Sequence, residues 1–331
     1  MSKQQRGFLL RLAVSVIGLA LVVLTVDVRQ AVASLLTIAP SGLLLAIAIF
    51  QLGLVVRALR WWLLLRAHAA NLPLWQLLRL YYIGMFFNLF LPTGFGGDVV
   101  RAAELGSSGV SRPTAAATVL LDRMLGIVAL FAVAIVAAPF AIGLVPANLL
   151  WTGVTLSVVG CFAGALVLQG RLFAVVLTWA ERLLGRFPLV LKLITSLRKF
   201  NDAVTLVGRE PRTLGAAFGV SLVFNLLLIL MHIVLSQALS LQIPPLAYAI
   251  IVPLTSILLL VPSIAGIGLR EVSLVGMLAL FDANLEASAA LGFAVLLQNI
   301  ISGVVGLLWY LQYSLVKRGQ STSDSVTPQP D

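Results

Sequence analysis

Residues 124–145 read MLGIVALFAVAIVAAPFAIGLV, a run of apolar and small side chains without any charge. A helix needs about 20 such residues to cross the hydrocarbon core of a bilayer. Similar long apolar runs occupy residues 8–26, 40–56, 74–91, 149–168, 213–239, 246–261 and 287–316, with a shorter one at 272–281. The pattern predicts an all-α integral membrane protein.

Composition also favours a membrane protein. Of 331 residues, 60% are hydrophobic and 10% are charged, whereas roughly a quarter are charged in ordinary soluble domains. We therefore expect one polytopic membrane domain over residues 1–318. The polar residues 319–331 (GQSTSDSVTPQPD) are too poor in apolar side chains to pack, and we expect them to be disordered.

The net charge of +10 argues for membrane lipids and against nucleic acid as a partner. Basic residues gather at the ends of apolar runs, as in membrane proteins whose basic loops stay in the cytoplasm. The single cysteine, Cys161, lies in an apolar run, so we expect no disulfide. We find no metal-ligand spacing and no nucleotide-binding or nucleophile motif, and we expect neither metal nor cofactor.

Residues 171–212 differ from the rest of the chain, because they carry eight Lys or Arg and three acidic residues among apolar ones at helical spacing. Such a pattern is typical of amphipathic helices that lie on a membrane surface. We expect one or two of them on the cytoplasmic side.

Charge also predicts the topology. If every long run crossed the membrane, the loop at residues 94–123 would place its arginines on the side that normally lacks positive charge. The conflict disappears if residues 74–91 enter, break at 92–97 and return, and if residues 246–281, broken at 262–268, do the same from the opposite side. We predict about six full transmembrane helices and two re-entrant broken helices. Both termini would lie in the cytoplasm, with the protein in a bacterial inner membrane.

The two breaks resemble each other. Residues 92–101 read PTGFGGDVVR, and residues 262–271 read PSIAGIGLRE. Each follows an apolar run and joins a proline, a glycine-rich break and an arginine close to a carboxylate. Two such segments of opposite orientation indicate an inverted repeat.

The first break contains candidate substrate-binding residues. Gly96 and Gly97 would let a headgroup approach the backbone N–H groups at the start of a half-helix, which favour anions. Asp98 and Arg101 are three residues apart and share a helix face, while Asn88 could hydrogen-bond the break. The alternative interpretation is a hinge that serves folding alone.

The second break offers Gly266, Gly268, Arg270 and Glu271. Ionisable residues between apolar segments are unfavourable in a membrane and usually functional. The two interpretations that remain are a substrate site and a buried structural ion pair.

Two further pairs of charged residues stand near other apolar runs. Asp122 and Arg123 precede residues 124–145 and are candidates either for substrate contact or for charges at a helix start. Arg57 and Arg60 precede Trp61 at the end of an apolar run. There they are typical of anchors for lipid headgroups.

Taken in order, these motifs resemble the transmembrane region of lysylphosphatidylglycerol synthases, over about residues 8–318. The motifs are Arg57-x-x-Arg60-Trp61, Asn88-x-x-Leu91-Pro92-x-x-x-Gly96-Gly97-Asp98-x-x-Arg101, Asp122-Arg123-x-x-Gly126 and Pro262-x-x-x-Gly266-x-Gly268-x-Arg270-Glu271. The resemblance implies a flippase-like region that moves aminoacylated phospholipid between leaflets, next to a soluble aminoacyltransferase domain. Only about a dozen residues (319–331) follow the expected membrane domain, so the resemblance implies the lipid-translocating half.

Three functions stay open at this stage. The first is a flippase-like protein for an anionic or aminoacylated phospholipid or a polyprenyl-linked lipid. The others are a membrane-embedded headgroup transferase and a non-catalytic subunit of a lipid-synthesis complex that works with a separate lipid-modifying enzyme. Under the first hypothesis, Arg101 and Arg270 bind the lipid phosphate while Asp98 and Glu271 hold them in place.

Overall fold

The computed structural model describes residues 28–36, 38–68, 70–90, 96–184, 188–208, 210–259 and 268–324, and within these ranges it contains helices and no strand. Helices long and apolar enough to cross a membrane are α3 (Pro40–Arg66), α6 (Arg112–Ala141), α7 (Ala147–Gln169), α10 (Pro211–Ala238) and the part of α13 from Leu285 to Gln312. The all-α membrane fold is therefore confirmed. The span expected at residues 8–26 lies outside the described residues.

The first broken helix forms a hairpin of α4 (Leu74–Phe90) and α5 (Gly96–Ser107). Its open ends are joined by a hydrogen bond from Gln76 Nε2 to Ser108 Oγ (3.2 Å). Nearer the break, a Cβ on Gly97 would overlap the carbonyl oxygen of Gly84. The chain therefore returns along α4, as predicted, although residues 91–95 of the break itself are not described.

The second hairpin consists of α11 (Tyr248–Leu258), preceded by the short η1 (Pro245–Ala247), and α12 (Leu269–Leu278), followed by η2 (Ala279–Phe281). The 11 residues of α11 and the 10 of α12 each reach about 16 Å, half of a hydrocarbon core of about 30 Å. Thr255 on α11 contacts Met277 on α12, so these two helices pack against each other. Residues 260–267 of this break lie outside the described ranges.

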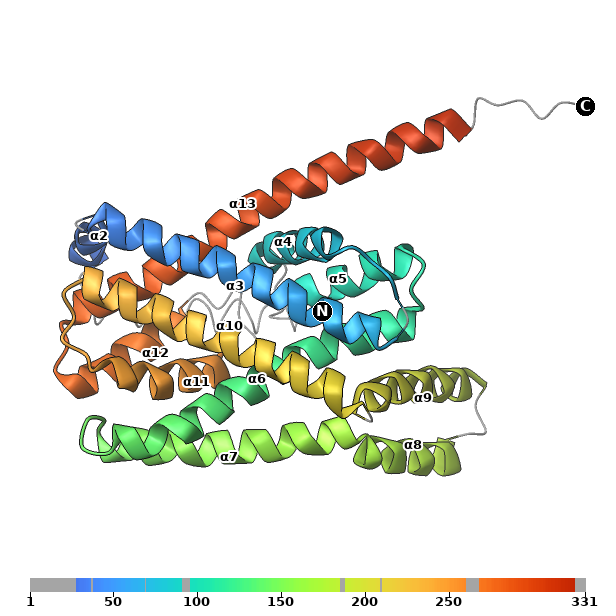
Figure 1. The fold of residues 1–331 in the computed structure, drawn as a ribbon, viewed down its shortest axis with the longest axis horizontal. Helices are drawn as coiled ribbons and strands as arrows, with labels where there is room; N and C mark the ends of the chain where they lie inside the picture. Colours follow the sequence, from blue (N-terminus) through green and yellow to red (C-terminus); the bar gives the residue numbers. More distant parts are fainter. Residues whose placement is uncertain are drawn as a thin grey trace, which may run out of the picture.

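Both hairpins pack on α13 (Leu285–Asp324), which runs diagonally across the bundle and projects beyond it at its carboxyl end (Figure 1). Glycines make the approach close, because added Cβ atoms would meet Glu271 at Gly292, Leu89 at Gly303 and the Tyr82 carbonyl oxygen at Gly306. Small residues commonly allow such backbone approach in membrane bundles. Near its start, α13 also contacts α2 (Val28–Leu36), where Ala31, Val275 and Ala289 pack together.

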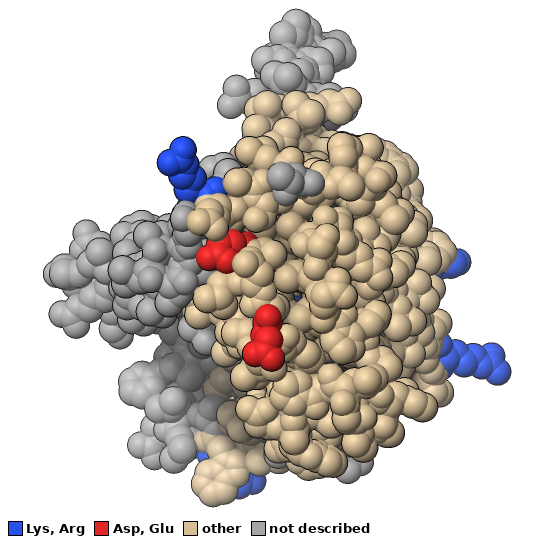
Figure 2. Space-filling model, turned by 90° about the vertical axis from the view of Figure 1, so that its left-hand side faces the viewer, with Lys and Arg blue, Asp and Glu red and all other residues tan. Residues whose placement is uncertain are grey.

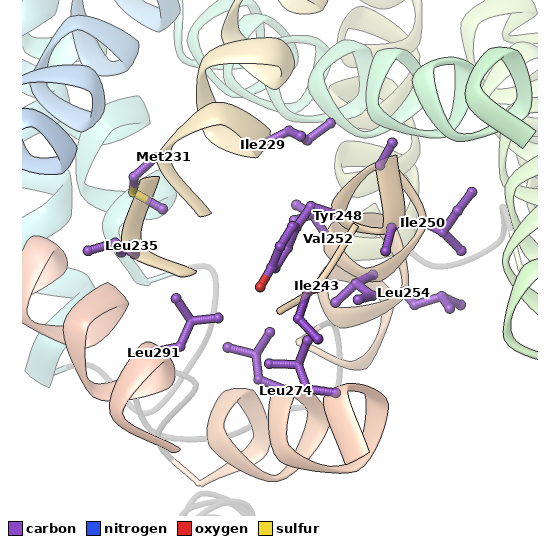
Figure 3. Close-up of a cluster of buried hydrophobic side chains, with 14 of the residues drawn as sticks. Ile229, Met231, Leu235, Ile243, Tyr248, Ile250, Val252, Leu254, Leu274 and Leu291 are labelled. Carbon is purple, nitrogen blue, oxygen red and sulfur yellow. The ribbon is translucent and has the colours of Figure 1, made fainter. Parts of the chain in front are cut away.

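A large apolar core surrounds the second hairpin (Figure 3). Tyr248, Ile250 and Ile251 of α11 are fully buried there, and they pack with residues of α6, α10, α12 and α13. The bundle end beside this core carries little charge over its centre, where a few acidic side chains stand (Figure 2). At the opposite end lie Arg66 and Arg112, so we call that end the basic end.

Residues 171–212 form a helical hairpin of α8 (Arg171–Leu184) and α9 (Pro188–Gly208) before α10 begins. Ala203, Val204 and Val207 of α9 are buried in a cluster that includes Leu121 of α6. This part of the segment therefore packs on protein with one face, and its place on a membrane surface stays a prediction. For α8, whose Trp179 is exposed, a membrane-surface position stays a prediction.

The polar tail also begins later than expected. Helix α13 continues to Asp324, so residues 319–324 are helical and the prediction of disorder from residue 319 is wrong at its start. Extending an existing helix is far easier than nucleating one. Residues 325–331 are outside the described part of the chain.

Candidate functional site

The centre of the site is an ion pair between α3 and α6. Arg60 Nε lies 2.7 Å from Asp122 Oδ1, and the two residues are 1% and 0% exposed. A Cβ on Gly126, one turn after Asp122, would lie 2.7 Å from Arg60 Nη1. Gly126 therefore leaves room for the guanidinium. The same nitrogen donates to Ser221 Oγ of α10 at 3.3 Å.

This arrangement corrects the expectation that Arg60 anchors a headgroup at the end of a helix. Helix α3 continues to Arg66, and Arg60 is buried against α6 and α10. Asp122 likewise does not stand at a helix start, because α6 begins at Arg112 with Ser111 as its cap. The apolar runs suggested earlier boundaries because polar residues inside a buried helix end a run without ending the helix.

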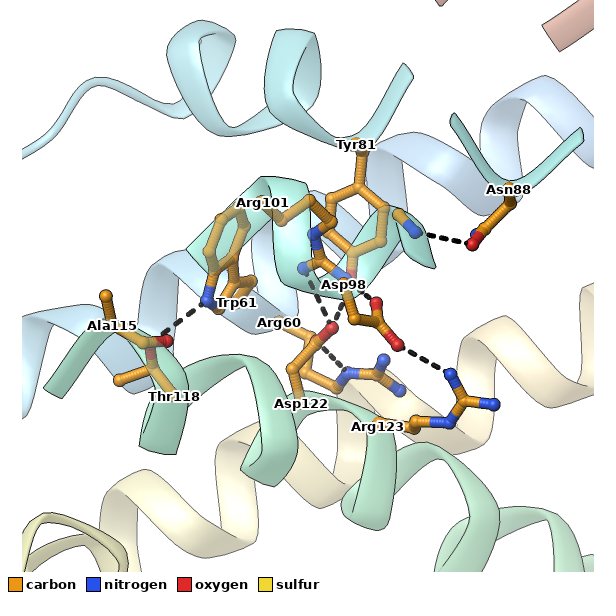
Figure 4. Close-up of polar contacts among 11 residues, drawn as sticks. Arg60, Trp61, Tyr81, Asn88, Asp98, Arg101, Ala115, Thr118, Asp122 and Arg123 are labelled. Carbon is orange, nitrogen blue, oxygen red and sulfur yellow. Dashed lines mark hydrogen bonds and ion pairs between the residues drawn. The ribbon is translucent and has the colours of Figure 1, made fainter. Parts of the chain in front are cut away.

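Arg101 reaches the same carboxylate from α5 (Figure 4). Its Nη2 lies 3.1 Å from Asp122 Oδ2, and its guanidinium carbon stands 3.6 Å from the ring centre of Tyr81 and 4.2 Å from that of Trp61. The Tyr81 hydroxyl donates to the same Asp122 oxygen. Asp122 thus binds groups from α3, α4 and α5 together.

Asp98 joins the outer part of the site. Its Oδ1 lies 3.1 Å from Arg101 Nη1, and its Oδ2 lies 2.5 Å from Arg123 Nη1. The side chains of Asp98 and Arg123 are 17% and 24% exposed, unlike the fully enclosed Asp122. Nearby, the Asn88 side-chain oxygen accepts from the Gly97 backbone N–H at 2.7 Å, which ties the end of α4 to the start of α5, as predicted.

Positive charge exceeds negative charge in this group, which we call the arginine cluster. It comprises Arg57, Arg60, Arg101 and Arg123 with Asp98 and Asp122, four cations and two anions. Arg57 lies over the rings of Tyr81 and Phe224, at 5.0 and 5.2 Å. The Nε atoms of Arg57 and Arg101 are buried without a hydrogen-bond partner in the described ranges. An excess of buried positive charge is unfavourable unless an anion compensates it.

The second hairpin pairs its charges differently. Gly268 has a φ of 83°, and its N–H donates to Glu271 Oε2 at 2.7 Å, so the carboxylate caps α12. Among the described residues, Arg270 and Glu271 form no ion pair, and Arg270 Nη1 and Glu271 Oε1 are buried without partners. The expected ion pair is therefore wrong. Gly266 lies outside the described residues.

Arg101 and Arg270 stand at different depths in the bundle. Tyr82 follows Tyr81, whose ring contacts Arg101, and it packs on Gly306 of α13. Glu271, next to Arg270, packs on Gly292. The two glycines are 306 − 292 = 14 residues apart, about 21 Å along a helix. The two arginines therefore belong to separate parts of the bundle, and the hypothesis that both bind the lipid phosphate stays a prediction.

The sequence model of a known family, the Lysylphosphatidylglycerol synthase TM region, matches residues 8–308 of the chain. The chain belongs to this family. A search of curated proteins finds no match. Membership confirms the resemblance seen in the motifs and makes this a membrane protein with a lipid-related function.

An apolar cavity of about 590 Å³ lies between α6, α10 and the start of α11. Such a volume is within the range of about 300–1,000 Å³ common for ligand pockets. Leu222 and Leu226 line it, and they directly follow Ser221 and Asn225, which bond Arg60 and the Gly126 carbonyl oxygen. The cavity and the arginine cluster therefore share the helices α6 and α10, on which neighbouring residues point in different directions.

Several residues of the site were not found from sequence. Tyr81 and Trp61 hold the Arg101 guanidinium between aromatic rings, and Trp61 Nε1 donates to Thr118 Oγ1 at 3.4 Å. The one available signal was Trp61 beside the arginine motif. Tyr81 stands inside an apolar run, where an aromatic residue is ordinarily read as packing.

Proposed function

We propose that this protein is flippase-like and translocates a lipid with an anionic headgroup, which enters at the arginine cluster. The observation that carries the proposal is Asp98, whose two oxygens bridge Arg101 and Arg123. A phosphate offers the same pair of oxygens to two guanidinium groups. Asp98 is thus an internal substitute for the phosphate that an arriving lipid can displace.

The distribution of exposure supports this exchange. Asp98 and Arg123 are partly exposed, while Arg60 and Asp122 are enclosed and hold the base of the site. Ligand exchange is therefore easiest at the outer pair. Because Asp98 returns to the arginines when the lipid leaves, binding is reversible, as transport requires.

The apolar cavity supports a lipid as the anion. It lies on α6 and α10, the helices that also carry Asp122 and Ser221 of the site, and its lining residues are all apolar. An amphipathic molecule with its phosphate at Arg101 and Arg123 can place a hydrocarbon chain there. A soluble anion would gain nothing from that cavity.

We also propose that the basic end faces the cytoplasm of a bacterial inner membrane, with both termini on that side. Arg66, Arg112 and Arg212 stand at this end, and such loops are retained inside. Reporter fusions at Arg198 and at the carboxyl terminus test the proposal. Both should be active as cytoplasmic reporters, and a periplasmic signal at Arg198 would refute the orientation.

The function is tested in proteoliposomes that contain phosphatidylglycerol labelled on its acyl chain, with leaflet exchange as the readout. Arg101→Ala and Arg123→Ala should each lower the exchange rate about ten-fold or more, the effect of losing one charged hydrogen bond. Arg123→Ala is the variant more certain to fold, because its side chain is partly exposed. The matched control is Arg66→Ala, which removes an exposed arginine that stacks on Trp62. Normal exchange in both variants would overturn the proposal.

A further inference from the structure

Gln298 is a buried amide in the middle of the membrane-spanning part of α13, Leu285–Gln312. The residue is 0% exposed, and neither its Nε2 nor its Oε1 has a hydrogen-bond partner among the described residues. Buried polar groups in proteins are nearly always hydrogen-bonded, because leaving them unpaired is unfavourable. An amide without partners at this depth therefore indicates a place where something polar binds.

Uncharged polar side chains from three helices gather next to it. Ser302, one turn further along the same face of α13, donates to the backbone carbonyl oxygen of Gln298 at 3.0 Å. Gln51 of α3 donates from Nε2 to Ser302 Oγ at 3.0 Å and accepts from the Tyr82 hydroxyl of α4 at 2.7 Å. This group, which we call the midplane station, consists of Gln51, Tyr82, Gln298 and Ser302.

Within the midplane station, Gln298 lies between the two charged sites, while Ser302 and Tyr82 lie on the side of the arginine cluster. Depth in the bundle can be measured by position along α13. Tyr82 packs at Gly306 of this helix, and Glu271 packs at Gly292. Gln298 is 306 − 298 = 8 residues from the first glycine and 298 − 292 = 6 from the second. These separations correspond to about 12 Å and 9 Å along the helix.

Unused hydrogen-bonding atoms occur at each of these depths. They are Arg101 Nε in the arginine cluster, both side-chain polar atoms of Gln298, and Arg270 Nη1 with Glu271 Oε1 at the second hairpin. A headgroup that crosses the bundle could therefore bind at each depth in turn.

We propose that the midplane station binds the hydroxyl-bearing part of a lipid headgroup halfway across the membrane. This inference rests on the proposed function and adds a substrate class to it. Amide and hydroxyl side chains both donate and accept, as do the hydroxyl groups of a glycerol or sugar headgroup. Its uncharged side chains can replace the hydrogen bonds that the headgroup loses when it leaves water. Because they carry no positive charge, they do not hold the phosphate tightly.

The test uses the full-length protein in proteoliposomes with two probes labelled on their acyl chains. Phosphatidylglycerol carries headgroup hydroxyls and phosphatidic acid carries none. Gln298→Leu should slow exchange of the first about ten-fold, the loss of roughly one hydrogen bond to the amide, and leave the second within about two-fold. In detergent, the melting temperature should rise by about 2 °C or more, because an unpaired buried amide is replaced by an apolar side chain.

Asn299→Leu is the matched control, since the Asn299 amide already donates to the Val295 carbonyl oxygen at 2.9 Å. It should leave exchange of both probes unchanged. A Gln298→Leu protein that melts lower and loses both probes equally would show a structural role and overturn the inference. Unchanged exchange of both probes in Gln298→Leu would overturn this inference but not the proposed function. A wild-type protein that moves neither probe would overturn both.

Discussion

The two helical hairpins have similar sequences around their breaks, yet their charges are paired in different ways. In the first hairpin, Asp98 and Arg101 form an ion pair at 3.1 Å. In the second, Glu271 caps its own helix through the Gly268 N–H, and Arg270 pairs with no described carboxylate. Residues three apart share a helix face, whereas adjacent residues point in different directions. Spacing within a short helix therefore decides whether a carboxylate neutralises its arginine or satisfies the backbone.

The surroundings differ as well. The first hairpin packs against α3 and α6, which supply Arg60 and Asp122. The second packs into the apolar core around Tyr248 and Leu274 (Figure 3). The first hairpin is therefore held mainly by ion pairs, whereas the carboxylate of the second bonds the backbone. Four substitutions test this difference.

The largest effect is expected for Asp122→Ala. It leaves Arg60 and Arg101 without their shared buried carboxylate, which should lower the free energy of unfolding by about 3–5 kcal/mol. Thermal unfolding in detergent measures the change. The double variant Arg60→Met with Asp122→Leu should recover part of the loss, and a loss below about 1 kcal/mol in the single variant would contradict a charge-built hairpin.

Next in size is Gly97→Ala. Its new Cβ would overlap the Gly84 carbonyl oxygen, so α4 and α5 must separate, at about 1–3 kcal/mol. The control is Gly276→Ala in α12, where nothing lies within 4 Å of an added Cβ. It should be neutral or slightly stabilising by helix propensity. Equal melting temperatures for the two variants would show that close packing does not hold the first hairpin.

Asp98→Asn changes binding more than folding. The amide cannot neutralise Arg101 and Arg123, so an anionic lipid no longer competes with a charged side chain. Affinity for phosphatidylglycerol, measured by native mass spectrometry on lipid titration, should rise about ten-fold, or about 1.4 kcal/mol. Leaflet exchange should nevertheless slow, because release becomes harder. Weaker lipid binding would contradict the role of Asp98 as a substitute for phosphate.

The smallest effect is expected for Glu271→Gln. Its amide oxygen can still accept from the Gly268 N–H, so the melting curve should change by less than about 1 kcal/mol. Glu271→Ala removes the acceptor and should cost more than the glutamine variant. If Glu271→Gln were as damaging as Asp122→Ala, the second hairpin would depend on charge like the first.

Much of the fold was predictable, because a bilayer tolerates few solutions. Apolar length, glycine-rich breaks and the distribution of arginines predicted the spans and both hairpins. The repeated break motif also predicts that the two break tips approach each other near the membrane centre. Both breaks lie largely outside the described residues, so this and the inverted repeat stay predictions. Of the site, Asp98, Arg101, Asp122 and Arg123 were separate candidates in the sequence, and the structure brings them together. Asn88 bonds the Gly97 N–H.

Other features required the tertiary structure. Gln298 stands in an apolar run, where a single amide does not by itself predict a site. Only the tertiary structure shows that its side chain is buried without a hydrogen-bond partner among the described residues. Arg60 was interpreted as a surface anchor because distance to a helix end is visible in sequence, whereas coverage by other helices is not.

The sequence by itself determined that this is an all-α membrane protein of two broken and several continuous helices, because hydropathy and backbone hydrogen bonding leave no other structure for such runs. Only the tertiary structure decided which charges are neutralised and which polar atoms stay unpaired. Those depend on contacts between residues such as Arg60 and Asp122, 62 positions apart, and no local pattern in the chain encodes which helices pack against each other.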